Sequence, residues 1–273
     1  MALIDIKLFS TSLWTHTDVR VVLPTPNEPF ESEDTPFYKE GKKYQVLYLL
    51  HGMFGDCSVW TRNTGIERYA QEKNLCVVSA SVTNSCYVDM VHNGSTGGKF
   101  MTYMLEELPK FIQYTFPVSK KRENTFIAGL SMGGYGTFRL ALERPELFGA
   151  AASLSGGLDM ASLQKNPSLK GGPKATMDYH SIFGDDSIEG SDNDLFALLP
   201  KKAKEGNLPK LYMCCGTEDF LYETNLKFRD FAKEIGVDIT YDESPGIHNW
   251  DYWDPQIRKV LDWLPLAGTL VEG

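Results

Sequence analysis

The sequence predicts an α/β fold in which a mostly parallel central sheet carries helices on both faces. Two observations support this fold class. Runs such as YQVLYLL (44–50) and NTFIAGL (124–130) are almost wholly apolar and rich in β-forming residues, as expected of strands that are covered on both faces. These runs alternate with segments of ten or more residues that have helical spacing, which is the order typical of a parallel sheet.

The first half of the chain supplies an edge of the sheet and its first buried strands. Residues 3–12 and 18–23 alternate between apolar and polar side chains, so two strands are predicted there. Residues 24–43 contain four prolines and many charges and are predicted to form a loop. The elements expected next are strands at 44–50, 75–82 and 124–130, helices at 58–71 and 99–115, and a Gly/Asn-rich loop at 83–98.

The second half continues the alternation after one interruption. Residues 157–190 are polar and glycine-rich, with no clear period. Because neither a repeat nor a linker divides the chain, we expect one domain over 1–273, with an irregular insertion near 157–190 over the active-site end of the sheet. The remaining expected elements are helices at 132–143, 192–205, 220–235 and 250–264 and strands at 148–156, 210–216 and 238–244.

The composition argues against several classes of partner. The formal net charge is −9 and the basic residues are scattered in short groups. Neither a nucleic acid nor an anionic membrane surface is therefore an expected partner. No apolar run approaches the roughly 18 residues that a transmembrane helix needs.

The cysteines and the N-terminal residues predict a cytoplasmic location. The chain has five cysteines, an odd number, without CxxC spacing, which favours reduced, buried thiols. Residues 1–14 alternate like a strand and lack the basic and apolar regions of a signal peptide. The alternative is a secreted protein whose signal peptide is no longer part of the chain.

Ser131 is predicted to be a nucleophile. It lies in Gly129-Leu130-Ser131-Met132-Gly133, a G-x-S-x-G turn between a buried strand and a helix that exposes a serine at the carboxyl end of a sheet. The two outer glycines allow backbone segments to approach where a Cβ would collide. Without the flanking strand and helix, an ordinary glycine-rich turn would explain the pattern equally well.

A serine hydroxyl needs a base, and chain order selects one. In this architecture the order is Ser, then Asp or Glu, then His. Of the five histidines, only His248 follows both Ser131 and the strand expected to carry the acid. Asp219 and Glu218 directly follow that strand, and Asp219 is favoured because its position places it where the loop crosses the sheet end. The acid would hold one tautomer of the imidazole.

The oxyanion of an acyl-transfer reaction needs two hydrogen-bond donors. The backbone N–H of Met132, directly after the nucleophile, is expected to be one of them. The other is expected from the loop at 51–55, with Met53 favoured over Gly52. His51 in that loop is expected to have a structural role.

With these segments in place, the chain resembles the esterase D-like, tributyrin-type acyl esterases of the α/β-hydrolase superfamily, which are related to feruloyl and acetyl-xylan esterase domains. The resemblance is carried by LYLLHGMFGDCSVW (47–60), YVDM (87–90), GLSMGGYGTFRLAL (129–142), CGTEDFLYETN (215–225) and GIHNWDYW (246–253). It implies an α/β-hydrolase fold and a hydrolase that needs no cofactor and no metal. It also implies that the substrate pocket is lined by Trp60, Tyr87, Asp89 and Trp250.

The function predicted is that of a serine carboxylesterase that cleaves short-chain acyl esters of small molecules, acetylated or feruloylated carbohydrates among them, through an acyl-enzyme. A first alternative is a thioesterase of the S-formylglutathione hydrolase type, although those enzymes typically carry SGLTC where this chain has HGMFG. A second is a non-catalytic, carbohydrate-binding scaffold. A homo-oligomer is among the expected states, because members of this branch often associate.

Overall fold

A computed structural model describes residues 1–26, 37, 39–92, 98–165 and 178–273. Eight of the described strands form one sheet in the order β1-β2-β5-β4-β6-β7-β8-β9. The first two strands pair antiparallel, β2 pairs antiparallel with β5, and the strands from β5 to β9 run parallel. Their bounds are β1 Ala2–Ser10, β2 Thr15–Leu23, β4 Gln45–Leu50, β5 Leu75–Ala80, β6 Thr125–Leu130, β7 Ala150–Leu154, β8 Lys210–Gly216 and β9 Ile239–Ser244.

Burial along the strands explains why their patterns differ. Every residue of β4, β5, β6 and β7 is buried, because helices cover both faces of the parallel part. Strand β1, at the antiparallel edge, alternates between half-buried and exposed residues. The mostly parallel central sheet with helices on both faces, expected from the sequence, is confirmed.

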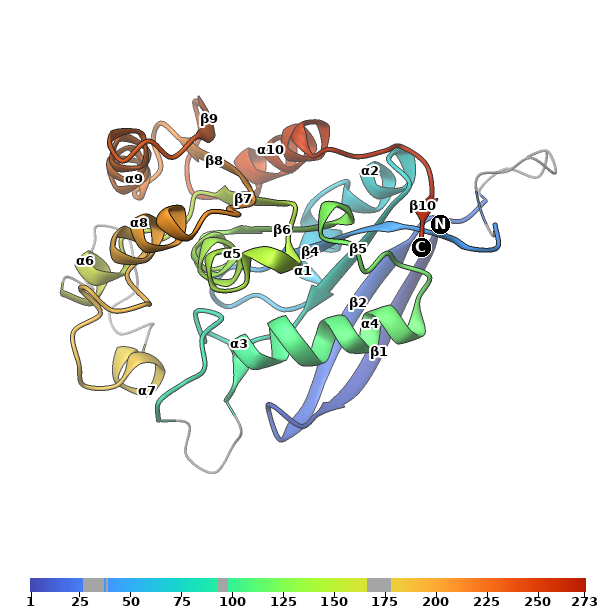
Figure 1. The fold of residues 1–273 in the computed structure, drawn as a ribbon, viewed down its shortest axis with the longest axis horizontal. Coiled ribbons are helices and arrows are strands. Elements are labelled where there is room, and N and C mark those ends of the chain that lie inside the picture. The colour runs from blue at the N-terminus through green and yellow to red at the C-terminus, as the bar shows by residue number, and fades with distance from the viewer. Residues whose placement is uncertain (27–36, 38, 93–97, 166–177) are drawn as a thin grey trace.

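The sheet separates two hydrophobic clusters of side chains. Helices lie on both faces of the sheet (Figure 1). On strand β4, Tyr48 and Leu50 belong to one cluster and Leu47 and Leu49 to the other, because successive side chains of a strand point to opposite faces. The first cluster contains side chains of α4 Leu108–Thr115, α5 Met132–Glu143, α8 Leu195–Glu205 and α9 Tyr222–Glu234. The second contains side chains of α1 Val59–Asn63, α2 Ile66–Glu72 and α10 Trp250–Trp263.

Two predicted helices differ from those in the structure. The helix expected at 58–71 is two helices, α1 and α2, with a break at Gly65, whose N–H donates to Asp254 Oδ1 at 2.9 Å. The helix expected at 99–115 consists of α3 Phe100–Thr102, a π-helical segment at Tyr103–Glu107 and α4. The wider π-helical turn directly precedes α4. The second residue of α4 is Pro109, which cannot donate a backbone hydrogen bond.

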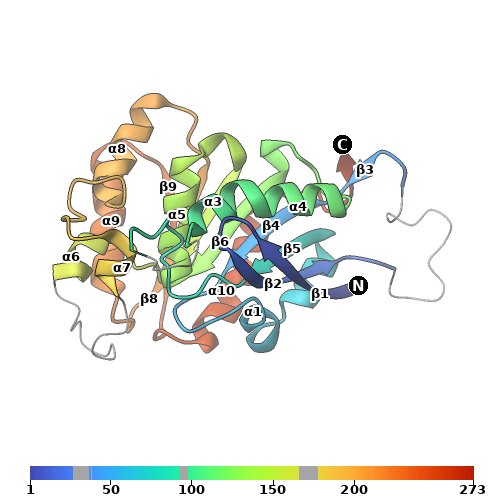
Figure 2. The same cartoon turned by 90° about the horizontal axis from the view of Figure 1, so that it is seen from below.

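Short elements complete the described chain. Strands β3 Lys42–Lys43 and β10 Val271–Glu272 pair in a separate two-stranded sheet, which no sequence pattern predicted. Figures 1 and 2 both show the N- and C-termini at the same end of the molecule. Within the insertion expected at 157–190, the structure has α6 Met160–Lys165 and α7 Tyr179–Phe183. Residues 166–177 of that insertion, and 93–97 of the loop at 83–98, lie outside the described residues.

The cysteines are free and buried, as the sequence predicted. Burial raises the pKa of the Cys76 thiol to about 12 and raises those of Cys86, Cys214 and Cys215 further. No helix within the described ranges is both long enough and apolar enough to cross a membrane.

Candidate active site

Ser131 lies at the sharp turn between β6 and α5. Its backbone has φ 54° and ψ −116°, a conformation that costs a non-glycine residue about 1–3 kcal/mol and that surrounding structure must hold in place. The Ser131 N–H donates to Leu154 O at 2.9 Å, and its carbonyl accepts from Tyr135 N at 3.1 Å and Gly157 N at 3.2 Å. The turn is thereby fixed to the neighbouring strand and to its own helix.

The glycines on either side of Ser131 allow this turn for steric reasons. A Cβ on Gly129 would lie 2.5 Å from the carbonyl oxygen of Gly133, and a Cβ on Gly133 would lie 2.6 Å from that of His51. Both contacts are with backbone atoms, which cannot swing aside. The glycines of the G-x-S-x-G pattern are therefore required because the β6–α5 turn packs closely against the end of β4.

His248 connects Ser131 to a buried carboxylate. Its Nε2 lies 2.9 Å from Ser131 Oγ, and its Nδ1 lies 2.8 and 3.0 Å from the two carboxylate oxygens of Asp219. The Asp219 side chain is fully buried, whereas that of His248 is 18% exposed. A carboxylate at Nδ1 favours the tautomer with its proton there, which leaves the Nε2 lone pair directed at the serine hydroxyl. The structure thus brings together the three residues that the sequence singled out.

Glu218, the other candidate acid, points elsewhere. It is exposed, and its carboxylate accepts hydrogen bonds from the N–H of Gly246 at 2.5 Å and from Thr217 Oγ1 at 2.9 Å. These two bonds lower the pKa of Glu218 below its usual value. Because Gly246 precedes His248 by two residues, Glu218 fixes the loop that carries the imidazole without contacting the ring.

The loop at 51–55 lies against the serine. A Cβ on Gly52 would be 3.3 Å from Ser131 Cβ, so the next residue, Met53, begins close to the hydroxyl. Across the described part of the chain, the backbone N–H groups of Met53 and Met132 have no hydrogen-bond acceptor. Two unused amide donors beside a serine are suited to a developing oxyanion.

His51 holds this loop in place. Its Nε2 accepts from Val82 N at 3.2 Å, and its Nδ1, which then carries the proton, donates to Gly52 O at 2.7 Å. Burial lowers the pKa of His51. The Tyr87 hydroxyl donates to His51 O at 2.9 Å, so the imidazole and the phenol together position the backbone of residues 51–53.

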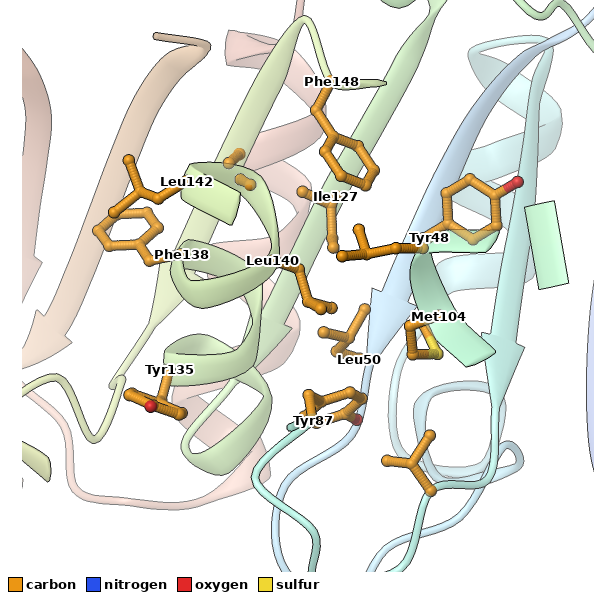
Figure 3. Close-up of a cluster of buried hydrophobic side chains, with 14 of the residues drawn as sticks. Tyr48, Leu50, Tyr87, Met104, Ile127, Tyr135, Phe138, Leu140, Leu142 and Phe148 are labelled. Carbon is orange, nitrogen blue, oxygen red and sulfur yellow. The ribbon is translucent and has the colours of Figure 1, made fainter. Parts of the chain in front are cut away.

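Two of the four residues proposed to line the pocket lie in the core instead. Trp60 is fully buried, and its indole N–H donates to Leu50 O at 3.0 Å. Tyr87 is fully buried as well, and a Cβ on Gly136 would lie 2.4 Å from its ring. Figure 3 shows Tyr87 among the packed side chains of the core, near Leu50. Neither side chain has exposed surface that could contact a substrate, so the structure does not support a pocket-lining role for Trp60 or Tyr87.

Asp89 and Trp250, the other two residues proposed to line the pocket, are not fully buried. Asp89 is exposed, and its carboxylate accepts from the N–H of Thr102 at 2.9 Å and from its hydroxyl at 2.7 Å, which gives it a structural contact with α3. Trp250 is half-buried at the start of α10, and its ring packs edge-on against Trp60 and Trp253 with centroid distances of 5.3 and 5.2 Å.

Sequence reasoning did not assign a role to the aromatic residues that contact His248. The ring of Trp253 meets the imidazole edge-on at 4.9 Å, and its N–H donates to Ser155 Oγ at 3.1 Å. The ring of Phe220 lies 4.6 Å from the imidazole and is 44% exposed. The sequence positions of these aromatic residues could have indicated the contacts. Phe220 directly follows Asp219, and Trp253 lies one turn into the helix that follows His248.

Comparison with known proteins identifies relatives of the whole chain. A family described as putative esterase matches residues 10–264. An acetyl esterase of Caldicellulosiruptor saccharolyticus is 34% identical over 97% of this chain and 98% of its own length. Two solved structures from Staphylococcus aureus are each 35% identical and cover 96% of this chain and 98% of their own. One is a substrate-bound, fluorophosphonate-binding serine hydrolase with a TM-score of 0.82, and the other is an S-formylglutathione hydrolase with a TM-score of 0.80.

The low pKa of buried His51 predicts a loss of stability in acid. The unfolded chain takes up a proton at this residue near pH 6.5, whereas the folded chain resists until lower pH. The free energy of unfolding should therefore fall as the pH decreases through 6.5, by up to about 1.4 kcal/mol per pH unit from this group. His51→Gln, whose amide can keep both hydrogen bonds, should show a smaller decrease between pH 7 and 5 in urea unfolding. The exposed His16→Gln serves as control, and equal slopes for His51→Gln and the wild type would contradict this prediction.

Proposed function

This chain belongs to the putative-esterase family of the α/β hydrolases, and we propose on that premise that Ser131, His248 and Asp219 form its catalytic triad. The family match and the similarity to the acetyl esterase and to the fluorophosphonate-binding hydrolase support the function of a serine carboxylesterase. The observation that carries the assignment of residues is the pair of contacts made by His248, one to Ser131 Oγ at 2.9 Å and one to Asp219 at 2.8 Å.

The first half of the reaction forms an acyl-enzyme. Ser131 Oγ attacks the ester carbonyl while its proton passes to His248 Nε2, and Asp219 stabilises the imidazolium through Nδ1. The carbonyl oxygen becomes an oxyanion and accepts hydrogen bonds from the N–H groups of Met53 and Met132. As the tetrahedral intermediate collapses, His248 returns the proton to the departing alcohol.

The second half releases the acid. A water molecule gives a proton to His248 Nε2 and attacks the acyl carbonyl, and the same two N–H groups hold the second oxyanion. The C–O bond to Ser131 then breaks, and His248 delivers the proton to Oγ. The products are a carboxylic acid and the free enzyme, so the cycle uses only residues of this chain and water.

The substrates that we propose are short-chain acyl esters, including acetylated and feruloylated carbohydrate esters. The acetyl esterase relative supports the short acyl group. Exposed apolar side chains that adjoin site residues in the sequence are Phe54 beside Met53, Phe220 beside Asp219 and Ile247 beside His248. They offer apolar surface for the parts of the ester that lie outside the reacting carbonyl.

A thioesterase of the S-formylglutathione hydrolase type is the second candidate. The observation that favours it is the S. aureus enzyme of that name, which is as similar to this chain as the fluorophosphonate-binding hydrolase is. The carboxylesterase is preferred because the family is described as an esterase and because the loop after β4 reads HGMFG, where S-formylglutathione hydrolases typically carry SGLTC.

Loss of the nucleophile should abolish turnover. Ser131→Ala should lower kcat for p-nitrophenyl acetate by at least about 10⁴-fold, because removal of one member of a triad costs most of its catalytic effect. A fluorophosphonate probe should label the wild type and not the variant, and an unchanged thermal transition would show that the fold survives. Labelling of the wild type at another residue, or near-normal turnover by Ser131→Ala, would refute the assignment; a wild type that is not labelled would favour the binding scaffold.

The two adjacent acids should respond differently. Asp219→Asn should lower kcat by about 10⁴-fold, because an amide no longer enforces the proton on Nδ1 of His248. Glu218→Gln should keep most of the activity, since its amide oxygen can still accept from Gly246 N. Steady-state kinetics of the two variants on the same ester provide the test, and a greater loss in Glu218→Gln would reverse the assignment.

A comparison of ester classes separates the two candidate functions. We expect kcat/KM for p-nitrophenyl acetate to exceed that for S-formylglutathione by at least about tenfold, a difference equivalent to about 1.4 kcal/mol in transition-state binding. Both assays use the same enzyme preparation, with Ser131→Ala as the blank. A preference for the thioester would favour the second candidate and would leave the role of Ser131 intact.

A further inference from the structure

We propose that His92, His180 and Asp185 form a binding site for one zinc ion, separate from the hydrolytic residues. One nitrogen from each imidazole and one carboxylate oxygen of Asp185 lie within 4.8 Å of one another, and all three residues are exposed. Imidazole nitrogen and carboxylate oxygen are ligands that zinc commonly takes in proteins. Within the described chain, no other group of three His, Cys, Asp or Glu side chains is arranged to hold a metal ion.

The backbone brings the three residues together from two distant segments. The N–H of Val91 donates to Ile182 O at 3.2 Å, and that of His92 donates to Ser181 O at 2.9 Å. These two bonds attach residues 91–92 to helix α7, which carries His180. The imidazole rings of His92 and His180 stack with their centroids 4.5 Å apart, so the two histidines are neighbours for a reason built into the main chain.

The turn after α7 returns Asp185 to His180. Gly184, at φ 82°, ends the helix, and its N–H donates to His180 O at 2.9 Å. A glycine adopts this positive φ without steric cost, and Asp185 Oδ1 lies 2.7 Å from His180 Nδ1. The other end of the helix is fixed as well, because Asp178 accepts from the N–H of Ser181 at 3.0 Å and from its hydroxyl at 2.6 Å.

The electrostatic environment favours a cation. Asp178, two residues before His180 at the start of α7, contributes a second carboxylate near the site. The chain as a whole carries a formal charge of −9, which raises the local concentration of cations in general.

Small side-chain rotations would complete the coordination. Zinc–nitrogen bonds of about 2.0–2.1 Å require the ligand atoms to move closer than 4.8 Å, and exposed side chains can rotate to do so. Zinc binding would leave one position of a tetrahedron to water. The ion would join residues 91–92 to α7 more firmly than their two backbone bonds do, so its role is structural. The proposed ion lies outside the expectation of a hydrolase that needs no metal, and the hydrolysis assigned to Ser131 does not use it.

Zinc titration of the full chain, after treatment with a chelator, tests the proposal. Isothermal titration calorimetry with Zn²⁺ alone should give one site per chain, and zinc should raise the melting temperature. His92→Ala and His180→Ala should each weaken binding by at least about tenfold. Asp185→Asn should weaken it by about 10–100-fold, whether the carboxylate is a ligand or only orients His180.

Two controls locate the ion. His16→Ala removes an exposed histidine on β2 and should bind zinc like the wild type, and His248→Ala should do the same if the ion is not held by the hydrolytic residues. Melting curves without zinc show whether each variant is folded, and Asp185→Asn provides a milder change should His180→Ala be unstable. Wild-type binding no tighter than that of a His92→Ala/His180→Ala double variant would overturn the proposal, and so would loss of binding in His248→Ala.

Discussion

The close approach of the β6–α5 turn to the end of β4 is the constraint on which the site depends. Gly133 lies against the carbonyl oxygens of Leu50 and His51, at distances that leave no room for a Cβ. This contact sets the position of Ser131 relative to the loop that begins at His51. Any sequence that kept the serine but enlarged Gly133 would have to separate the two segments, and Ser131 would no longer lie against Gly52 and the loop that follows it.

The geometry of His248 depends on a second set of contacts, made by residues that do not touch the reacting atoms. Asp219 contacts the imidazole directly, while Glu218 holds the backbone of Gly246 two residues earlier. Trp253 closes one side of the ring and is itself held by Ser155. The two adjacent acids therefore differ in burial and in their contacts: Asp219 is enclosed beside the imidazole, whereas Glu218 is exposed.

The parts of the fold and site that could be predicted from the sequence are those with a local cause. Buried strands such as β4 and β6 are continuous apolar runs, and the elbow at Ser131 requires small neighbours, so both leave a pattern in consecutive residues. His248 and Asp219 followed from chain order and from their positions after strands. The burial of Trp60 and Tyr87 had no such signal, because the space that Tyr87 fills is created by Gly136 on a different element. The pairing of residues 91–92 with α7 is likewise a contact between distant segments.

The five buried thiols have a consequence for the chemical durability of the protein. A thiol reacts with oxidants and alkylating agents as its thiolate, and burial holds the pKa of Cys76, Cys86, Cys214 and Cys215 far above neutral pH. Sulfenic acid formation, the first step of cysteine oxidation, is therefore suppressed in the folded chain. The five cysteines of the folded chain are thereby protected from the reagents that attack an exposed thiolate, and unfolding would remove this protection.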